Sequence, residues 1–343
     1  MTRLVAFALA VIVVFNACKT ATVNAGLPQP QVARIAFYNV ENLFDTIDHP
    51  VILDEEFTPN SEKQWTEARY QTKLEHISYV IEGMQFPELM GLSEVENKGV
   101  LEDLCKKTML SGKDYGIVHY DSPDIRGIDV AFIYQNKAFT VASSSTKTID
   151  FPKEIVEDYT TRDILKIEGK LYGTDVIVFV NHWPSRYGGV RESEPKRLYV
   201  AQQLRSMIDE VFAANAKANV IILGDLNDET DNKSVAEVLR AGTATANATD
   251  LYNCMAELDQ ANKGSYNYRG NWNMLDQIIV SNGLKSGAAG WKVTNAGIYS
   301  RKWMMYEDKK YGFRPSRTYG GPRYFGGFSD HLPVFVDLLP QSQ

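Results

Sequence analysis

Six short polar motifs constrain the fold of this chain most strongly, because each lies at the end of an apolar run with the length of a β-strand. The motifs combine carboxylates, amides and two histidines, and none contains a thiol. They are Asn39-Val40-Glu41, Ser93-Glu94, Asn181-His182-Trp183, Gly224-Asp225-Leu226-Asn227, Leu275-Asp276-Gln277 and Ser329-Asp330-His331. Oxygen ligands of this kind suit Mg²⁺, Mn²⁺ or Ca²⁺ better than zinc. Histidines beside such a metal indicate phosphate-ester chemistry.

The pattern of apolar residues predicts one α/β domain with a mixed sheet architecture over residues 32–340. The chain has 343 residues, of which 44% are hydrophobic, and no Pro-, Gly- or Ser-rich linker divides it. The run Val176–Val180 is apolar on both faces and predicts a central strand. Helices are predicted from Thr66, as N-cap, to Gly83 and from Glu194 to Ala214. Residues 283–328 show little periodicity and are predicted to form a long ordered loop.

The charge distribution argues against a chain that binds nucleic acid by electrostatics alone. The net charge is −7 and the sequence pI is about 5.4. One stretch, residues 301–323, departs from this average with a local balance of +5 and interleaved aromatic residues. This stretch either contacts a phosphate backbone and stacks bases, or is a solvated loop whose aromatic side chains pack on the sheet.

The first 25 residues are predicted to be a signal peptide and short tether. Arg3 precedes a 12-residue apolar run, Leu4–Phe15, which is too short to span a bilayer. The run leads to Cys18, the candidate lipidated residue of a lipoprotein signal. The alternative is ordinary cleavage after Ala25. Both alternatives predict an exported protein, either periplasmic, anchored in a membrane by lipid, or secreted.

The other two cysteines, Cys105 and Cys254, do not form a disulfide framework, because two cysteines in so long a chain cannot constrain it broadly. We expect buried apolar thiols, with a single bridge between them as the alternative.

Asp225 and Asn227 follow a buried strand at a spacing of two residues, so extended backbone would place both side chains on one face. An ionised Asp can deprotonate a water while the amide holds a phosphate oxygen. The alternative is a polar turn, which the same residues also favour. His182 is either a capped strand end or a donor to phosphate.

The remaining motifs supply further candidate ligands. Glu94, at a strand end, is a candidate metal anchor, and Asp330 next to His331 could bind metal beside a phosphate donor. Arg126 and Arg162 are candidate phosphate donors, although most single arginines are surface charges.

Taken in chain order, the motifs resemble those of the endonuclease/exonuclease/phosphatase superfamily, whose fold is DNase I-like. The resemblance extends from Ile35 to Leu338 and is closest to exported bacterial members. Ser93 departs from the pattern, because many members have Gln before the glutamate. The resemblance implies a four-layer α/β/β/α sandwich of two mixed β-sheets.

The resemblance also implies a role for each motif residue. Mg²⁺, or alternatively Mn²⁺ or Ca²⁺, would be held by Glu94 with Glu41 or Asp330. The implied catalytic residues are His182, Asp225, Asn227, Asp276 and His331. Asn39 and Arg126 would contact phosphate. Asp225 would activate the attacking water, and Asp276 would position His331.

Two substrate hypotheses stay open, and both describe a monomeric hydrolase. The first is a nuclease that acts on DNA or RNA. The second is a phosphatase or phosphodiesterase that acts on small or lipid-borne phosphate esters, such as inositol phosphates or sphingomyelin. A non-catalytic binding protein would be expected to lack one of the core site residues, and all of them are present.

Overall fold

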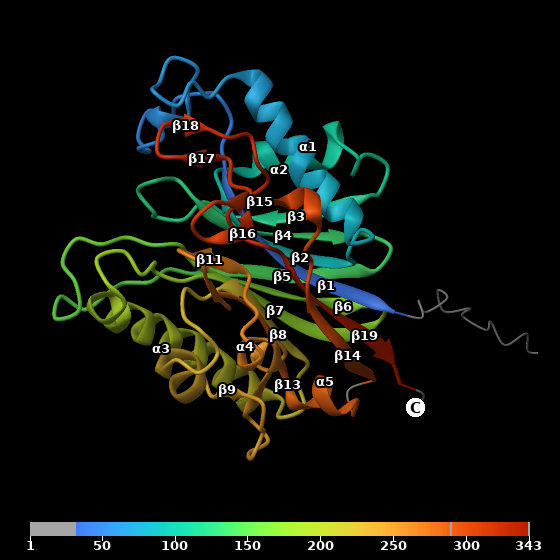
Figure 1. Cartoon of the computed structure of the whole chain (residues 1–343). Helices are drawn as coiled ribbons and strands as arrows, with labels where there is room; N and C mark the ends of the chain where they lie inside the picture. Colours follow the sequence, from blue (N-terminus) through green and yellow to red (C-terminus); the bar gives the residue numbers. More distant parts are fainter. Residues whose placement is uncertain (1–31, 289, 342–343) are drawn as a thin grey trace, which may run out of the picture.

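The computed structural model describes residues 32–288 and 290–341 (Figure 1). The predicted signal peptide, its tether and the candidate lipidation site Cys18 lie outside the described residues. Within the described part of the chain, no helix has the length and apolar character needed to cross a membrane.

Two mixed β-sheets form the centre of the molecule. The first sheet has six strands, in the order β14 (Trp291–Ile298), β19 (Val334–Pro340), β1 (Ala33–Leu43), β2 (Leu89–Val95), β4 (Asp129–Gln135) and β3 (Tyr115–His119). The second sheet has seven, in the order β5 (Phe139–Lys147), β6 (Ile164–Leu171), β7 (Thr174–His182), β8 (Val220–Asp225), β13 (Asp276–Ser281), β10 (Leu251–Asn253) and β9 (Ala241–Gly242). The run Val176–Val180 belongs to β7, an interior strand, as its two apolar faces predict.

Helices cover the outer face of each sheet, which confirms the predicted four-layer arrangement (Figure 1). Helices α1 (Glu67–Gly83) and α2 (Lys98–Lys107) pack on the first sheet, and α3 (Val190–Ala214) packs on the second. Thr66 occupies the N-cap position of α1, as predicted. Helix α3 begins four residues before its predicted start and accommodates Pro195. The short helices are α4 (Ala256–Gln260), α5 (Asn282–Ser286), η1 (Glu55–Phe57), η2 (Ser234–Val238) and η3 (Lys302–Met304).

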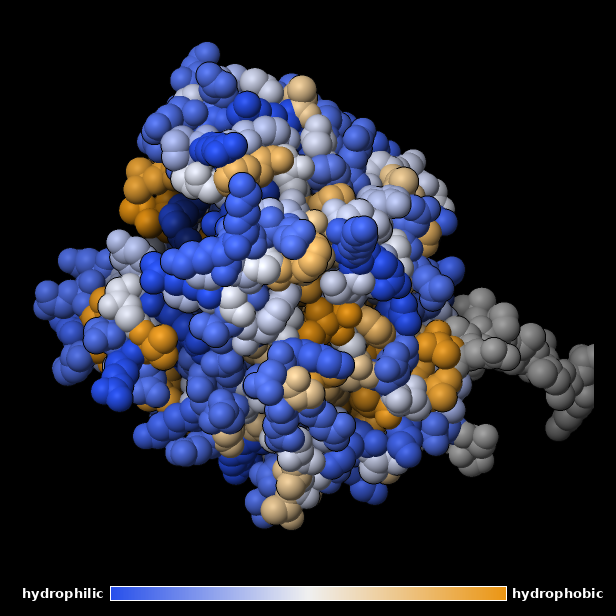
Figure 2. Space-filling view, in the orientation of Figure 1, coloured by the Kyte–Doolittle hydropathy of each residue, from blue (hydrophilic) through white to orange (hydrophobic). Residues whose placement is uncertain are grey.

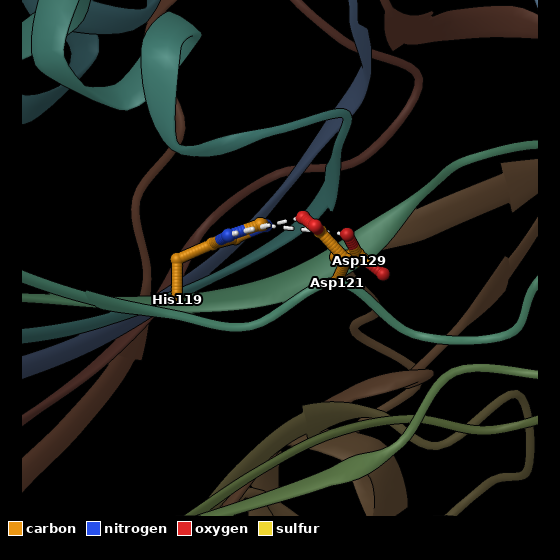
Figure 3. A group of neighbouring side chains, drawn as sticks. All are labelled: His119, Asp121 and Asp129. Atoms are coloured by element: carbon orange, nitrogen blue, oxygen red, sulfur yellow. Dashed lines mark ion pairs between the residues drawn. The ribbon is translucent and has the colours of Figure 1, made fainter. Parts of the chain in front are cut away.

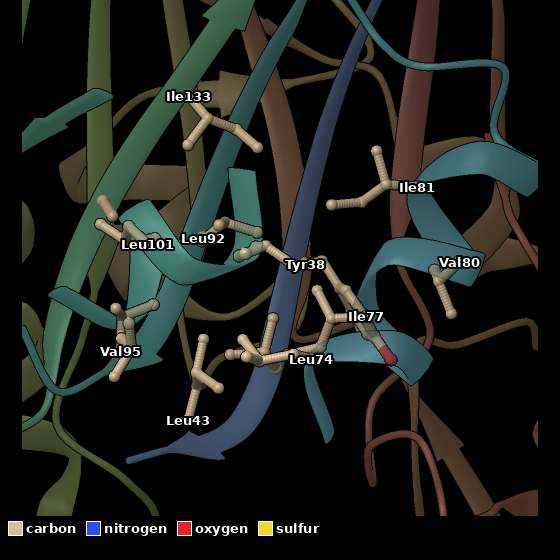
Figure 4. Close-up of a cluster of buried hydrophobic side chains, with 14 of the residues drawn as sticks. Tyr38, Leu43, Leu74, Ile77, Val80, Ile81, Leu92, Val95, Leu101 and Ile133 are labelled. Atoms are coloured by element: carbon tan, nitrogen blue, oxygen red, sulfur yellow. The ribbon is translucent and has the colours of Figure 1, made fainter. Parts of the chain in front are cut away.

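Three hydrophobic cores hold the four layers together. The central core fills the space between the two sheets, and one further core lies beneath the helices on each side. Figure 4 shows the core beneath α1 and α2, where Leu74 and Ile77 of α1 meet Tyr38 of β1. On the face drawn in Figure 2, hydrophilic residues predominate and apolar residues form separate small patches.

The prediction of a continuous loop over residues 283–328 is wrong. The segment contains α5, the edge strand β14 and small hairpins built from β15 (Met305–Asp308), β16 (Gly312–Pro315), β17 (Tyr319–Gly320) and β18 (Arg323–Tyr324). A further hairpin joins β11 (Tyr266–Tyr268) to β12 (Asn271–Asn273). Strand β14 shows no clean alternation because most of its side chains are partly or fully exposed at the sheet edge. The cysteines follow the prediction: Cys105 and Cys254 are both free and buried.

The contact between the sheets leads to a stability prediction at Gly91 of β2. A Cβ atom added there would lie 3.0 Å from Phe37 Cδ2, 3.1 Å from Val180 Cγ1 and 3.2 Å from Leu223 Cβ. These atoms come from both sheets, so the core has little freedom to relax, and we expect Gly91→Ala to destabilise the fold by about 1–3 kcal/mol.

Chemical denaturation measures this change, and Gly242→Ala is the matched control. Gly242 also lies in a strand, but its added Cβ would meet no atom within 4 Å. Equal midpoints for the two variants would contradict the close approach of the sheets at Gly91.

Candidate active site

The strand register brings all six polar motifs to one edge of the two sheets. In the first sheet β1 and β2 run parallel, with Asn39 opposite Ser93, while β19 runs antiparallel and begins opposite Phe37, two residues before Asn39. In the second sheet His182 at the end of β7 lies opposite Asp225 at the end of β8. Asp276 opens the antiparallel strand β13 opposite Asp225. Ends of parallel strands and starts of antiparallel strands therefore meet at the same place.

Left-handed backbone directs several site residues away from their strands. Glu41, Glu94 and Asn227 have φ values of 52°, 63° and 51°. This backbone conformation is unfavourable for residues other than glycine, and residues that adopt it occur often at functional sites. Of the two alternatives for Asp225 and Asn227, the chain therefore adopts the polar turn and does not continue in extended backbone. Instead the Asn227 backbone N donates to Asp225 Oδ1 at 2.9 Å, while its amide Nδ2 donates to the Trp183 carbonyl at 3.0 Å.

Asn39 joins the two halves of the site. Its Nδ2 donates to Glu94 Oε1 at 3.2 Å within the first sheet and to Asp225 Oδ2 at 3.0 Å in the second sheet. Its Oδ1 accepts a hydrogen bond from the backbone N of Glu41 at 3.0 Å. Ser329 Oγ donates to the Asn39 carbonyl at 2.8 Å. The side chain of Asn39 is thus committed to holding other site groups.

The three predicted metal carboxylates, Glu41, Glu94 and Asp330, line one cavity of about 470 Å³. Arg126 and Arg317 line the same cavity. Arg317 Nη2 donates to Asp330 Oδ2 at 2.6 Å, and the backbone N of Asn42 donates to Glu94 Oε2 at 3.1 Å. Carboxylate oxygens that converge on a polar cavity are the ligand type that Mg²⁺, Mn²⁺ and Ca²⁺ prefer.

Glu41 is held by Thr318, which in turn is bound by a buried lysine that the sequence analysis missed. The Thr318 backbone N donates to Glu41 Oε2 at 2.6 Å, and Lys73 Nζ of α1 donates to Thr318 Oγ1 at 2.7 Å. Burial and the nearby Asp330 charge raise the pKa of Glu41 to about 7, although the Lys73 charge opposes this. Burial lowers the pKa of Lys73. The carboxylates of this cavity are therefore crowded and suited to a positive partner.

His331 is paired with Asp276, as predicted, and lies close to Asp225. His331 Nδ1 is 2.7 Å from Asp276 Oδ2, and His331 Nε2 is 3.8 Å from Asp225 Oδ2. Burial alone would lower the pKa of His331, but the Asp276 and Asp225 charges raise it well above its usual value. Near neutral pH His331 is consequently an imidazolium whose Nε2 faces Asp225.

His182 lies on the other side of Asp225, with its Nε2 3.6 Å from Asp225 Oδ2. Burial, followed by the charges of Arg162 and Arg126, lowers the pKa of His182 well below its usual value. The two histidines around Asp225 therefore differ in charge near neutral pH, with His182 neutral. Burial raises the pKa of Asp225 itself to about 6.

The two arginines predicted as phosphate donors have different surroundings. Arg162 is buried and donates to the carbonyls of His182 and Trp183 and to Asp124 at 3.0 Å, so the prediction that it contacts phosphate is wrong. It supports the turn after β7 instead. Arg126 is exposed at the cavity and pairs with Asp124 at 3.2 Å, which leaves it near a ligand.

Sequence reasoning missed Lys73 and treated Arg317 only as one charge in a basic stretch. A signal for Lys73 was present, because it shares the helical spacing of the buried residues Tyr70, Leu74 and Ile77 on α1. The sequence also did not predict that Asp225, Asp276 and His331 together could bind a metal ion. One ligand atom from each of these residues lies within 4.8 Å of the other two.

Comparisons with known proteins agree with this geometry. Residues 34–339 match the sequence model of a family described as the Endonuclease/Exonuclease/phosphatase family. No curated protein matches the chain. Among solved structures, the chain is similar to D. rerio TDP2 complexed with single strand DNA product, with a TM-score of 0.55 and 14% identity over 90% of this chain and 99% of the other.

Two further solved structures differ from TDP2 in activity or bound ligand. A mannosyl-6-phosphatase of Bacteroides thetaiotaomicron gives a TM-score of 0.56 and 14% identity, over 90% of this chain and 99% of the other. The human nocturnin catalytic domain with bound sulfate anion gives a TM-score of 0.57 and 15% identity, over 91% of this chain and 95% of the other. At such identities the likeness shows the shared fold alone.

The pairing of His331 with Asp276 predicts that the His331 pKa depends on the Asp276 charge. The experiment uses protein that a chelator keeps free of metal. The Asp276→Asn change removes a negative charge that raises the His331 pKa. We expect the His331 pKa to fall by about 1–3 units, measured by NMR of the imidazole protons. Glu210→Gln, an exposed change on α3, is the control and should leave the titration unchanged. An unaltered His331 titration in Asp276→Asn would show that Asp276 does not stabilise the imidazolium.

Proposed function

The chain belongs to the endonuclease/exonuclease/phosphatase family, and from this premise we propose that it hydrolyses phosphodiester bonds by in-line attack of water, with a bound divalent metal. One observation carries the proposal. Asp225, which accepts hydrogen bonds, lies between a neutral and a charged histidine beside a cavity lined by three carboxylates. Water activation, charge stabilisation and metal binding thus have candidate groups in one place.

The metal would be bound by Glu94 together with Glu41 or Asp330. The donor set fits Mg²⁺, with Mn²⁺ or Ca²⁺ as alternatives, because these residues offer carboxylate oxygens to a polar cavity. When bound, the ion supplies positive charge that neutralises the oxygens of the scissile phosphate. Lys73 and Arg317 keep two of the carboxylates, Glu41 and Asp330, in place around that position.

Asp225 is the candidate general base. Its Oδ1 is oriented by the Asn227 backbone N and its Oδ2 by Asn39 Nδ2, so the carboxylate has little freedom to turn away from the attacking water. With a pKa of about 6, Asp225 is mostly ionised at neutral pH and able to accept a proton from water. Asn227 thereby acts through Asp225 and is a positioning residue.

The two histidines would stabilise the charge that develops on the phosphate. His331, held as an imidazolium by Asp276, offers a charged Nε2 donor. His182 offers a neutral imidazole, held by Arg162 through the backbone of the turn that follows β7. The water attacks phosphorus directly, so no covalent intermediate with the protein is required.

We propose nucleic acid as the substrate. The basic stretch 301–323 supports this, because it reaches the site through Arg317 and exposes Phe313 and, to a smaller extent, Tyr306. Exposed aromatic rings next to arginines can stack bases and bind a phosphate backbone. Other aromatic residues of the stretch pack on the fold, as the alternative interpretation expects: Trp303 packs against Phe328, and Tyr319 is buried.

A small or lipid-borne phosphate ester is the second candidate substrate. Glu56 and Glu62 line the candidate metal cavity together with the three predicted metal carboxylates. Lys63 lines the same cavity and pairs with Glu56 at 2.9 Å, so Glu62 supplies the additional negative charge, which disfavours a second phosphate on that side and favours a substrate with one phosphate. This observation supports an inositol phosphate or sphingomyelin-like ester.

We also propose that the protein is exported and acts as a monomer. The sequence of residues 1–25 supports export, either to the periplasm, to a membrane through a lipid on Cys18, or to the medium.

Plasmid nicking tests the nuclease proposal. The chain from Gly26 onward is incubated with supercoiled plasmid and Mg²⁺, beside the His182→Ala variant. We expect nicking by the wild type and a loss of about 10²–10³-fold in the variant, because a donor to the transition state is removed. His49→Ala, which changes an exposed histidine in a loop, is the matched control and should retain activity.

No nicking with any divalent metal would exclude the DNA endonuclease proposal. The same preparations are also assayed on RNA and on small phosphate esters, each at 50 and 200 mM salt. Steep loss of activity with salt is typical of binding to a nucleic-acid backbone, whereas turnover of a small ester should change little.

The pKa of Asp225 predicts the acid limb of the pH profile. Because only the ionised carboxylate accepts a proton, kcat/KM should rise tenfold per pH unit below about 6 and level off above it. The Asp225→Asn variant should lose most activity and show no such limb. A wild-type profile that is flat from pH 4.5 to 7 would contradict the assignment of Asp225 as the base.

A further inference from the structure

A second group of potential ligands lies at the outer edge of the first sheet, away from the polar cavity. Figure 3 shows the His119 ring directed towards the carboxylates of Asp121 and Asp129. His119 Nε2 is 3.2 Å from Asp129 Oδ2, and His119 Nδ1 is 3.8 Å from Asp121 Oδ1. One ligand atom from each residue lies within 4.8 Å of the other two. Three such atoms at this separation can coordinate one ion.

The imidazole in this group is buried beside the Asp129 carboxylate without a well-formed hydrogen bond to it. The His119 side chain is only 2% exposed, yet its Nε2 makes no hydrogen bond of normal geometry to any described residue. A buried polar atom without a hydrogen bond costs about 1–3 kcal/mol, so such an atom calls for a ligand. The Asp129 carboxylate is also buried, at 4% exposure, and accepts one bond, from the Ser122 backbone N to its Oδ1 at 2.9 Å. Its Oδ2 remains directed at His119.

We propose that His119, Asp121 and Asp129 bind a divalent transition-metal ion, Mn²⁺ or Zn²⁺, at a site separate from the candidate active site. The presence of an imidazole distinguishes this set from the all-carboxylate cavity and favours these ions over Mg²⁺ and Ca²⁺. Asp121 is 88% exposed, so water can complete the coordination.

The position of this site suggests what the ion does. His119 ends β3, Asp121 follows it, and Asp129 begins β4, so the ligands lie at both ends of the loop 120–128. That loop carries Arg126, which lines the active-site cavity, and Asp124, which binds Arg162. An ion that links the two ends would restrict the loop and hold Arg126 at the cavity.

Calorimetric titration with Mn²⁺ in excess Mg²⁺ tests the proposal without using activity as its readout. Wild type is expected to show one binding event that Asp121→Asn weakens by about tenfold or more, since a ligand is removed. Asp121 is exposed, so this change should leave the fold intact. Glu154→Gln, another exposed carboxylate, is the control and should bind as the wild type does.

Pulsed EPR of bound Mn²⁺ identifies the nitrogen ligand. A nitrogen coupling present in the wild type and lost in His119→Gln would support the site, provided that circular dichroism shows a folded variant. If His119→Gln does not fold, the Asp121→Asn titration decides alone. Equal Mn²⁺ affinity and stoichiometry in wild type and Asp121→Asn would overturn the proposal.

Discussion

The side chain of Asn39 connects the two sheets at the point where the site forms. One amide nitrogen donates to Glu94 of the first sheet and Asp225 of the second, which places the candidate metal ligand and candidate base at a fixed separation. This bridge can form only because the sheets pack closely, as they do at Gly91. The packing of the central core thus determines the geometry of the polar edge, and the amide leaves none of its own hydrogen-bonding groups unpaired.

The electrostatics of the site depend on which cation each acidic group meets. Asp330 meets Arg317, Glu41 is reached through Thr318 by Lys73, and Asp276 meets His331. Burial by itself favours the neutral form of Glu41. Burial lowers the pKa of both histidines, but the Asp276 and Asp225 charges reverse this effect at His331, whereas the Arg162 charge adds to it at His182. The two imidazoles that flank Asp225 therefore carry different charges. A cluster of similar residue types thereby acquires distinct chemical roles.

The strands, the outer helices and the order of the motifs were predictable from the sequence, since long apolar runs such as Val176–Val180 carry a strong signal. The choice between a polar turn and extended backbone at Asn227 was not, because Gly-Asp-x-Asn is compatible with both. Lys73 escaped detection because a charge on a helix is usually solvated, and the role of Arg162 is set by carbonyl groups that no sequence pattern reveals. Contacts between distant segments account for each of these failures.

Strand β19 lies between β14 and β1 and is the C-terminal strand of the first sheet. During synthesis on a ribosome, one hydrogen-bonding edge of β1 therefore stays unpaired until residues 334–340 are made, and His331 is made only just before them. A nascent chain that already contains Asn39, Glu94, His182 and Asp225 still lacks the imidazolium and the strand that positions it. The order of synthesis thus delays assembly of the complete constellation until nearly the whole domain has emerged, because its contacts join the two ends of the fold.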